Sequence, residues 1–238
     1  MKKVIIIGST SGIGKVLSER FEANNYKVGI TGRRDELLIE LKDKNPDAYL
    51  TKVLDVTDTA SSIQQLEELT NELGGLDLLV ISSGIGELNE ALDFEIEKQT
   101  IDTNIAGFTS IADWAFSYFE KQQAGHLVVI SSIGGIRGSS QAPAYNASKA
   151  YQINYTEGLR QKAAKLKMPI FITDIRPGLV DTKMAKGEGL FWVMPLEKAV
   201  NQMYIAIIKK KKVVYVTKRW RMIAFVLKIL PRGIYDKM

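Results

Sequence analysis

The chain has 238 residues, of which 45% are hydrophobic and 25% charged, and its net charge is +5. These are ordinary values for a globular protein, and a chain of this length can bury roughly 70–75% of its unfolded surface without disulfides. It contains no cysteine and one histidine, His126. That composition excludes thiolate zinc sites and cysteine nucleophiles and argues against a Ser–His–Asp hydrolase. We therefore expect no metal site and interpret His126 as structural.

Short apolar runs alternate with longer amphipathic runs along most of the chain. The predicted strands, in chain order, are Val4–Ile7, Tyr26–Thr31, Ala48–Leu54, Leu76–Ser82, Leu127–Ser131, Ile170–Ile175 and Val213–Val216. The predicted helices between them are Ile13–Asn24, Glu36–Lys44, Ala60–Leu73, Gln99–Glu120, Ala144–Lys167 and Leu196–Lys209. Apolar strands without alternation are typical of a sheet covered on both faces, and alternating strands and helices favour parallel pairing. We predict a single α/β domain over residues 1–238, with a doubly wound parallel sheet.

The first predicted strand runs directly into a glycine-rich turn, Gly8-Ser9-Thr10-Ser11-Gly12-Ile13-Gly14, and a helix follows. The amides and dipole of a helix N-terminus attract anions, and glycine lets a phosphate approach the backbone. The spacing differs from the Gly-x-Gly-x-x-Gly of the wider dinucleotide-binding class. A nucleotide-triphosphate loop does not fit, because Ser9 stands at its first glycine and Val16 at its magnesium-binding Ser or Thr. The turn therefore predicts a site for a dinucleotide diphosphate.

Two arginines, Arg33 and Arg34, follow the second predicted strand, which ends without a carboxylate. An acidic residue at this point holds the adenosine ribose of NAD, whereas an arginine accommodates the 2′-phosphate of NADP. A guanidinium matches phosphate both in charge and in its forked donors. We expect these arginines to select NADP(H). The alternative is that they are only an exposed helix start.

A predicted strand ends in Ser131 and Ser132, Tyr145 follows Ser132 by thirteen residues, and Lys149 stands four residues further on. Residues four apart lie on one face of a helix. A free phenol has a pKa of about 10, so we expect the Lys149 ammonium to lower the pKa of Tyr145. Tyr145 would then be the acid in carbonyl reduction and the base in alcohol oxidation, while Ser132 polarises the carbonyl oxygen.

Together these motifs resemble the signature of the short-chain dehydrogenase/reductase family, over residues 2–217. The resemblance implies a Rossmann-type fold and an NADP(H)-dependent oxidoreductase acting on CH–OH groups. The absence of cysteine fits a reducing cytosol, so we expect a cytoplasmic protein. It also implies a homodimer or homotetramer formed through the helices near Gln99–Glu120 and Ala144–Lys167.

The resemblance assigns further roles. Asn104 is similar to an asparagine that holds a water passing protons to Lys149, which also holds the nicotinamide ribose. Asp55 and Val56 resemble the pair at the adenine ring. A further segment resembles the one that contacts the nicotinamide carboxamide and phosphates in this family. It contains Pro177, Gly178, Leu179, Val180 and Thr182. Ile7 replaces a usual Thr, and Ser82-Ser83-Gly84-Ile85 replaces a usual Asn-Asn-Ala-Gly, so Ser83 and Gly84 would contact the adenosine ribose through backbone only.

Residues 219–238 depart from the alternating pattern and form an appendage. The run Trp220–Leu230 is apolar on nearly every face and has basic flanks, but it is about half as long as a bilayer span. It predicts a helix packed on its own fold or on another subunit. The alternatives are an interfacial helix at the membrane surface and an apolar wall near the substrate mouth.

The segment Lys183–Pro195, which contains Leu190, Phe191 and Trp192, favours an apolar substrate such as a long-chain 3-oxo compound. The basic run Lys209–Lys212 is either a solvated end or attracts phosphate groups or anionic lipid. No nucleic-acid motif accompanies it. Two classes without turnover stay open: a cofactor-sensing regulator with a Rossmann fold and a membrane-surface scaffold.

Overall fold

The structure is a computed structural model that describes residues 1–185 and 191–237. Within these residues, seven parallel strands form one sheet in the order β3-β2-β1-β4-β5-β6-β7. The strands are β1 (Lys2–Ile7), β2 (Tyr26–Gly32), β3 (Tyr49–Val53), β4 (Leu78–Ile81), β5 (Gly125–Ile130), β6 (Ile170–Pro177) and β7 (Val213–Val216). The order reverses between β1 and β4, which confirms the predicted doubly wound, Rossmann-type sheet.

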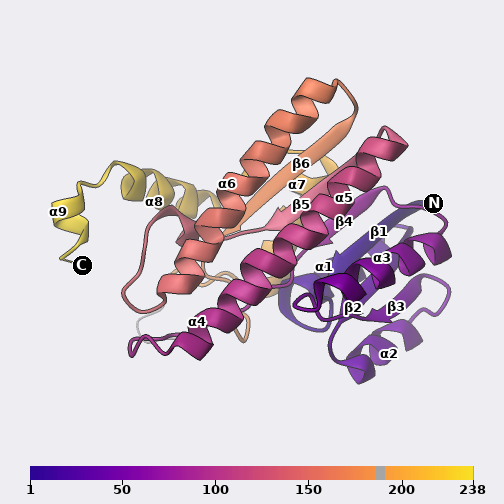
Figure 1. The fold of residues 1–238 in the computed structure, drawn as a ribbon, viewed down its shortest axis with the longest axis horizontal. Coiled ribbons are helices and arrows are strands. Elements are labelled where there is room, and N and C mark those ends of the chain that lie inside the picture. The colour runs from indigo at the N-terminus through magenta and orange to yellow at the C-terminus, as the bar shows by residue number, and fades with distance from the viewer. Residues whose placement is uncertain (186–190, 238) are drawn as a thin grey trace.

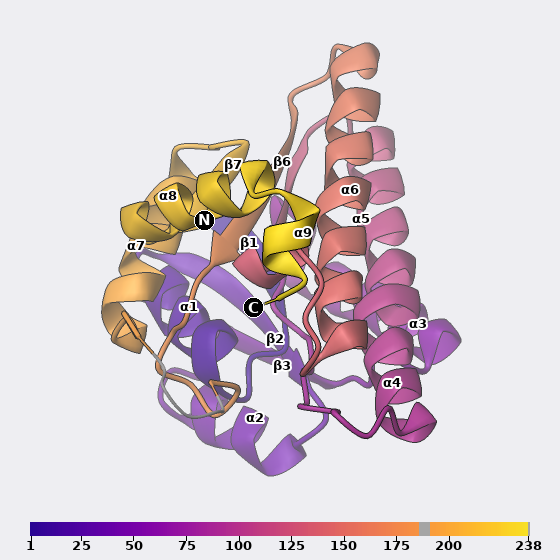
Figure 2. The ribbon, with the colours of Figure 1, turned by 90° about the vertical axis from the view of Figure 1, so that its left-hand side faces the viewer.

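Helices cover both faces of this sheet (Figures 1 and 2). One face carries α3 (Thr59–Leu73), α4 (Phe94–Ile101), α5 (Phe108–Gln122) and α6 (Pro143–Leu166). The other carries α1 (Gly12–Glu22), α2 (Asp35–Asp43) and α7 (Leu196–Ile208). Because successive strand residues point to opposite faces, Ile5 and Ile7 join the first core, and Val4 and Ile6 join the second.

The predicted strands lie within two residues of the observed ends, but the prediction of one continuous helix over Gln99–Glu120 is wrong. The helix begins earlier, at Phe94, because the Asp93 carboxylate accepts a hydrogen bond from the Glu95 amide at 2.9 Å. It is then interrupted by a π-helical turn, η1 (Asp102–Gly107), before α5 continues. A Cβ on Gly107 would lie 2.4 Å from the Val56 carbonyl oxygen, so the interrupted helix lies close against the loop after β3.

The C-terminal appendage forms two helices, α8 (Lys218–Ile229) and α9 (Arg232–Tyr235), at the β7 edge of the sheet (Figure 2). Trp220 and Ala224 are buried against the fold. The Arg137 guanidinium donates to the carbonyl of Leu230 at 3.1 Å and lies 4.2 Å from the centre of the Tyr235 ring. The appendage therefore packs on its own chain, through a segment that follows β5.

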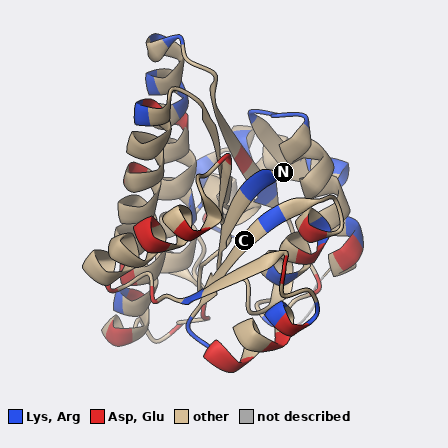
Figure 3. Ribbon diagram, turned by 90° about the vertical axis from the view of Figure 1, so that its right-hand side faces the viewer, with Lys and Arg blue, Asp and Glu red and all other residues tan. Residues whose placement is uncertain are grey.

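Within residues 1–185 and 191–237, no helix combines the length and the apolar character needed to cross a bilayer. On the side of the molecule that Figure 3 shows, basic and acidic positions are interspersed along the helices around the sheet. The sequence from 198 to 235 differs, because it contains ten Lys and Arg residues and no Asp or Glu.

Candidate active site

The predicted site residues converge at the carboxyl-terminal edge of the sheet. The glycine turn follows β1, Ser83 follows β4, Ser132 follows β5, and Pro177 ends β6. In an open parallel sheet, the crevice at this edge beside the reversal of strand order is where ligands bind. The topology thus brings together residues that are far apart in the sequence.

The glycine turn is packed so tightly that only glycine fits at two of its positions. Gly8 has a φ of +87°, and a Cβ there would lie 2.9 Å from the Ser83 backbone. A Cβ on Gly14 would lie 2.0 Å from the Gly8 carbonyl oxygen. Ser9 is buried and donates to the Ile6 carbonyl at 2.7 Å. The turn therefore opens α1 with its backbone close to the crevice, and this cradle fits the diphosphate of a dinucleotide.

The two arginines after β2 have different surroundings. The Arg34 guanidinium donates to the Thr10 hydroxyl at 2.7 Å and to the Ser11 hydroxyl at 3.2 Å, which ties it to the glycine turn. Arg33 makes none of these contacts. Its side chain is 67% exposed and lies 4.0 Å from the Asp55 carboxylate, which also accepts a hydrogen bond from the Thr57 amide. Two separate cations therefore flank the crevice. Val56, beside Asp55, is buried.

Ser132 and Tyr145 face each other between β5 and α6. The Ser132 hydroxyl accepts a hydrogen bond from the Gly134 amide at 3.0 Å, in the short helical turn η2 (Ile133–Ile136), and a hydrogen bond joins it to Tyr145. Close packing holds the phenol ring, since a Cβ on Gly86 would lie 2.6 Å from it. In the protein alone, burial raises the pKa of Tyr145, and the hydrogen bond with Ser132 opposes this only in part. The expected fall in the Tyr145 pKa is therefore not a property of the protein alone.

Lys149 lies one helical turn after Tyr145, with its ammonium nitrogen 5.8 Å from the centre of the phenol ring. It donates to the Ile130 carbonyl at 3.2 Å and to the Gln152 side-chain oxygen at 2.9 Å. Burial lowers the pKa of Lys149 to about 8, and the negative charge of Asp174 opposes that shift. The lysine is therefore a buried cation close to losing its charge.

Asn104 lies in η1 and is completely buried. Its side chain accepts a hydrogen bond from the Ile85 amide at 2.9 Å and donates to the Ile85 carbonyl at 2.7 Å and to the Ser148 hydroxyl at 3.0 Å. A Cβ on Gly84 would lie 3.3 Å from both Asn104 Oδ1 and Lys149 Nζ. Asn104 thus supplies hydrogen bonds to the unusual Ser-Ser-Gly-Ile loop and lies beside Lys149.

The segment after β6 meets both the glycine turn and the appendage. A Cβ on Gly12 would lie 3.6 Å from the Thr182 methyl group, which places Thr182 beside the phosphate cradle. The backbone of Leu179 and Val180 is held by Met194, whose amide donates to the Leu179 carbonyl at 2.9 Å. Gly178 lies against the buried Trp220, since a Cβ there would come within 2.2 Å of the indole ring.

An aromatic cluster borders this segment. The ring centres of Phe191 and Trp220 are 5.4 Å apart, and those of Phe191 and Trp192 are 5.6 Å apart. Phe191 and Trp192 are 53% and 51% exposed. Leu190, which also formed part of the substrate prediction, lies outside the described residues.

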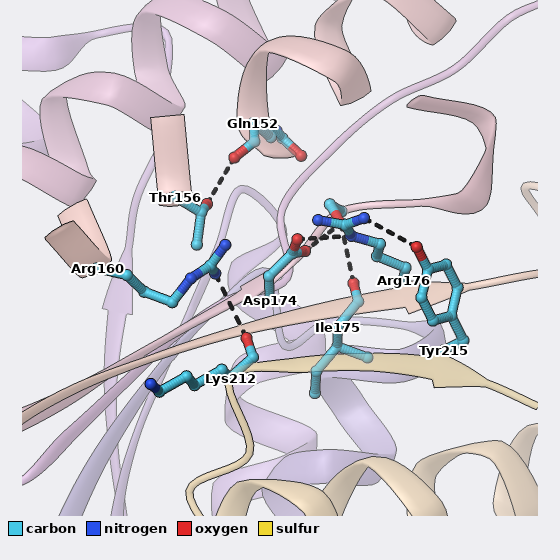
Figure 4. A network of polar contacts seen from close by, with 9 residues as sticks. Gln152, Thr156, Arg160, Asp174, Ile175, Arg176, Lys212 and Tyr215 are labelled. Atoms are coloured by element: carbon cyan, nitrogen blue, oxygen red, sulfur yellow. Dashed lines mark hydrogen bonds and ion pairs between the residues drawn. The ribbon is translucent and has the colours of Figure 1, made fainter. Parts of the chain in front are cut away.

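Sequence reasoning missed a buried polar network beneath the site, shown in Figure 4. Asp174 and Arg176 in β6 form an ion pair with 2.7 Å between the carboxylate and Nε, and Arg176 also donates to the Tyr215 hydroxyl at 3.0 Å. Ser131 donates to the other carboxylate oxygen. One signal was available, because residues two apart in a buried strand point to the same face. Among the described residues, no three His, Asp or Glu side chains form a group that could hold a metal ion.

Comparison with known proteins extends these observations. The sequence profile of the short chain dehydrogenase family matches residues 2–190. An uncharacterized oxidoreductase of Mycobacterium tuberculosis (strain CDC 1551 / Oshkosh) is 32% identical over 191 residues, which cover 77% of this chain and 75% of the relative. An uncharacterized oxidoreductase of Myxococcus xanthus (strain DK1622) is 28% identical over 242 residues, covering 99% of this chain and 95% of the relative.

Two solved structures share the fold. ElxO with NADP bound superposes with a TM-score of 0.79 at 25% identity and covers 90% of this chain and 96% of its own. A 3-ketoacyl-(acyl-carrier-protein) reductase from Brucella melitensis, complexed with NADH, superposes with a TM-score of 0.81 at 19% identity. It also covers 90% of this chain and 96% of its own, and at that identity it shows the fold alone.

Proposed function

The chain belongs to the short chain dehydrogenase family of oxidoreductases, and from this premise we propose that it transfers hydride between NADP(H) and a carbonyl or secondary alcohol. The observation that carries the proposal is the convergence of Ser132, Tyr145 and Lys149 at the strand edge that also holds the glycine turn. When bound, the nicotinamide supplies the hydride in reduction and accepts it in oxidation.

The protein's own groups then handle the proton and the developing charge. Ser132 donates a hydrogen bond to the carbonyl oxygen and stabilises the charge that develops there. Tyr145 gives its proton to that oxygen in reduction and takes it back in oxidation. The buried Lys149 ammonium favours the phenolate form of Tyr145 and holds the nicotinamide ribose.

The Tyr145→Phe variant separates an enzyme from a cofactor-sensing regulator. The variant keeps the ring that packs against Gly86 and removes only the hydroxyl. We expect unchanged NADPH binding by fluorescence titration and a loss of turnover of at least about a hundredfold, the usual size of a general-acid contribution. Turnover equal to that of the wild type would refute the proposed chemistry.

We propose NADP(H) rather than NAD(H) as the cofactor. Arg34, held at the glycine turn, and the exposed Arg33 provide two cations for a 2′-phosphate. The NADP in the ElxO structure supports this choice by similarity. We expect Arg33→Ala to lose most of the preference for NADPH over NADH, measured as the ratio of the two kcat/KM values. Equal kcat/KM with both cofactors in the wild type would exclude the preference.

We propose that the substrate is apolar and lipid-like, such as a long-chain 3-oxo compound. The support is the aromatic cluster formed by the half-exposed Phe191 and Trp192 with the buried Trp220, which adjoins the segment after β6. A screen of NADPH consumption across ketones of graded chain length tests this. We expect kcat/KM to rise with chain length, and activity confined to small polar sugars would refute it.

We also propose that the enzyme is cytoplasmic and meets anionic membranes through α8. Its outward face exposes Met222, Phe225, Val226 and Ile229, which recur at helical spacing. The basic residues Arg219 and Arg221 border this stripe and are exposed, and no acidic residue lies between 198 and 235. Apolar burial combined with attraction to anionic lipid is the basis of interfacial binding.

Vesicle co-sedimentation of the full chain tests the membrane contact. Cutting the chain at Lys218 would remove the buried Trp220, so surface substitutions are the better probe. We expect Phe225→Ser with Ile229→Ser to abolish binding to phosphatidylserine vesicles, whereas Phe94→Ser, at an exposed position on α4, leaves it intact. No binding by the wild type, or a dimer that the double variant dissociates, would assign the stripe to another role.

Two further proposals follow from the family. We propose one nucleotide-binding domain over residues 1–238 with residues 219–238 as its appendage. We also propose a homodimer or homotetramer formed through the long helices α4–α5 and α6. A monomer in sedimentation velocity at micromolar concentration would contradict this assembly.

A further inference from the structure

The buried Lys149 ammonium has a side-chain partner on its own helix, one turn further along. Gln152 is only 1% exposed. Its carbonyl oxygen accepts a hydrogen bond from Lys149 Nζ at 2.9 Å, and its amide nitrogen donates to the Asn104 main-chain carbonyl at 2.9 Å. The reverse orientation would turn the NH₂ group toward the ammonium and the oxygen toward another carbonyl oxygen. The two contacts therefore fix the orientation of the amide.

We propose that Gln152 is a positioning residue for Lys149, and that its amide takes the place between Lys149 and Asn104 where the family resemblance predicts a water molecule. The amide holds the ammonium charged and aimed along the α6 face that carries Tyr145. Only the catalytic consequence rests on the proposed function. The contact between the two side chains stands without it.

The groups around Lys149 explain why a neutral acceptor matters. Helix α6 contributes Tyr145, and β6 contributes Asp174, whose charge is paired with Arg176. From β5 comes the Ile130 carbonyl, and from η1 and the loop after β4 come the neutral Asn104 and Gly84. A neutral amide supports the ammonium without cancelling its charge, so the field of Lys149 still favours the phenolate of Tyr145.

The chemistry of the amide also limits what the link can do. A carboxamide has no proton that it exchanges readily at neutral pH, whereas a water molecule both accepts and donates protons. The bridge from Lys149 to the Asn104 carbonyl is therefore a positioning device and not a proton path. Asn104 serves the site through its main-chain carbonyl, which accepts a hydrogen bond from the Gln152 side-chain NH₂ group.

The test follows the titration of Lys149 directly, in the protein without cofactor or substrate. In protein labelled with ¹³C-lysine, the Cε resonance missing from Lys149→Met identifies the residue, and burial should place its titration midpoint near pH 8, below ordinary lysines. Gln152→Leu removes the acceptor and should move this midpoint down by about one pH unit. Gln152→Glu keeps the shape, adds a negative charge and should move the midpoint up.

Thr156→Val is the matched control. Thr156 is buried one turn further along α6, and its hydroxyl donates to the Gln152 main-chain carbonyl, so the variant removes a polar group without touching Lys149. Its Lys149 midpoint should equal that of the wild type. Equal midpoints in the wild type and both Gln152 variants, or shifts of the same sign in both, would overturn the proposal. Should Gln152→Leu fail to fold, the near-isosteric Gln152→Glu decides alone.

Steady-state kinetics test the catalytic consequence of the Gln152 contact. The alkaline limb of kcat for NADPH-dependent reduction should follow the Lys149 midpoint, moving down in Gln152→Leu and up in Gln152→Glu. Lower kcat with unmoved limbs would reduce Gln152 to a packing role and overturn its effect on the charge of Lys149. If no carbonyl supports turnover, the proposed function fails, while the resonance titration still decides the proposal about Gln152.

Discussion

Replacing Asp174 with asparagine removes the negative charge from a buried ion pair while keeping the shape of the side chain. The Asp174 side chain is completely buried and that of Arg176 is 6% exposed. Without the carboxylate, the Arg176 guanidinium keeps the Tyr215 hydroxyl as a partner but loses its counter-charge, in the setting that Figure 4 shows. Breaking a buried pair in this way costs about 3–5 kcal/mol, and we expect the free energy of unfolding to fall by that amount.

The double variant Asp174→Leu/Arg176→Met separates the cost of an unpaired charge from the value of the pair. With both charges gone, the remaining penalty comes from the hydroxyls of Ser131 and Tyr215, which lose partners at about 1–3 kcal/mol. The double variant should therefore be more stable than Asp174→Asn, although it carries more substitutions.

Urea denaturation followed by circular dichroism measures these free energies, provided that the transition has two states. A loss below about 1 kcal/mol in Asp174→Asn would show that water or rearrangement relieves the arginine. The single variants Asp174→Leu and Arg176→Met complete the comparison, and a loss in the double variant equal to the sum of their two losses would show that the residues do not interact. Either result would refute the reasoning. Because Asp174 raises the pKa of Lys149, Asp174→Asn should also lower the Lys149 titration midpoint.

Three further predictions concern other parts of the fold. Burial lowers the pKa of His126 to about 4. His126 therefore takes up a proton at a higher pH in the unfolded chain than in the folded chain, and the free energy of unfolding falls as the pH drops from about 6.5 to about 4. His126→Leu should remove up to about 3 kcal/mol of this loss, measured by urea unfolding at both ends of that range. Arg137→Leu removes hydrogen bonds to carbonyls at the end of α8, so amide hydrogen exchange over residues 218–235 should become at least about tenfold faster. Equal exchange rates in the variant and the wild type would contradict the role of Arg137 in anchoring α8 and α9. Gly178→Val should displace Trp220 and cost about 1–3 kcal/mol, and an unshifted tryptophan emission would count against this contact.

Val4–Ile7 was predictable because it is buried on both faces and stands out as an apolar run between Lys3 and Gly8, whereas Val213–Val216 is an equally apolar run at the edge of the sheet and is only partly buried. The glycine turn was also predictable, since its spacing reflects local backbone geometry. The positions of Tyr145 and Lys149 on one helix face followed from the same local rule.

Contacts between distant segments were not predictable from one sequence. The attachment of Arg34 to Thr10, the bridge from Gln152 to Asn104 and the packing of Trp220 on Gly178 each join residues at least 24 positions apart. The same holds for the pKa of Tyr145, because the extent of its burial is a property of the folded chain.

The π-helical turn at Asp102–Gly107 amounts to one extra residue inside an otherwise continuous helix. The π-helical turn absorbs that residue locally, so deleting one residue here should restore regular α-helical winding while Phe94–Ile101 and α5 keep nearly their present orientation. The change would be confined to the turn itself, where the Asn104 carbonyl would join the regular hydrogen bonding of the helix and no longer accept from the Gln152 amide. A one-residue deletion in η1 would therefore leave the helix intact and disconnect it from the lysine, so chain length at this point is itself under functional constraint.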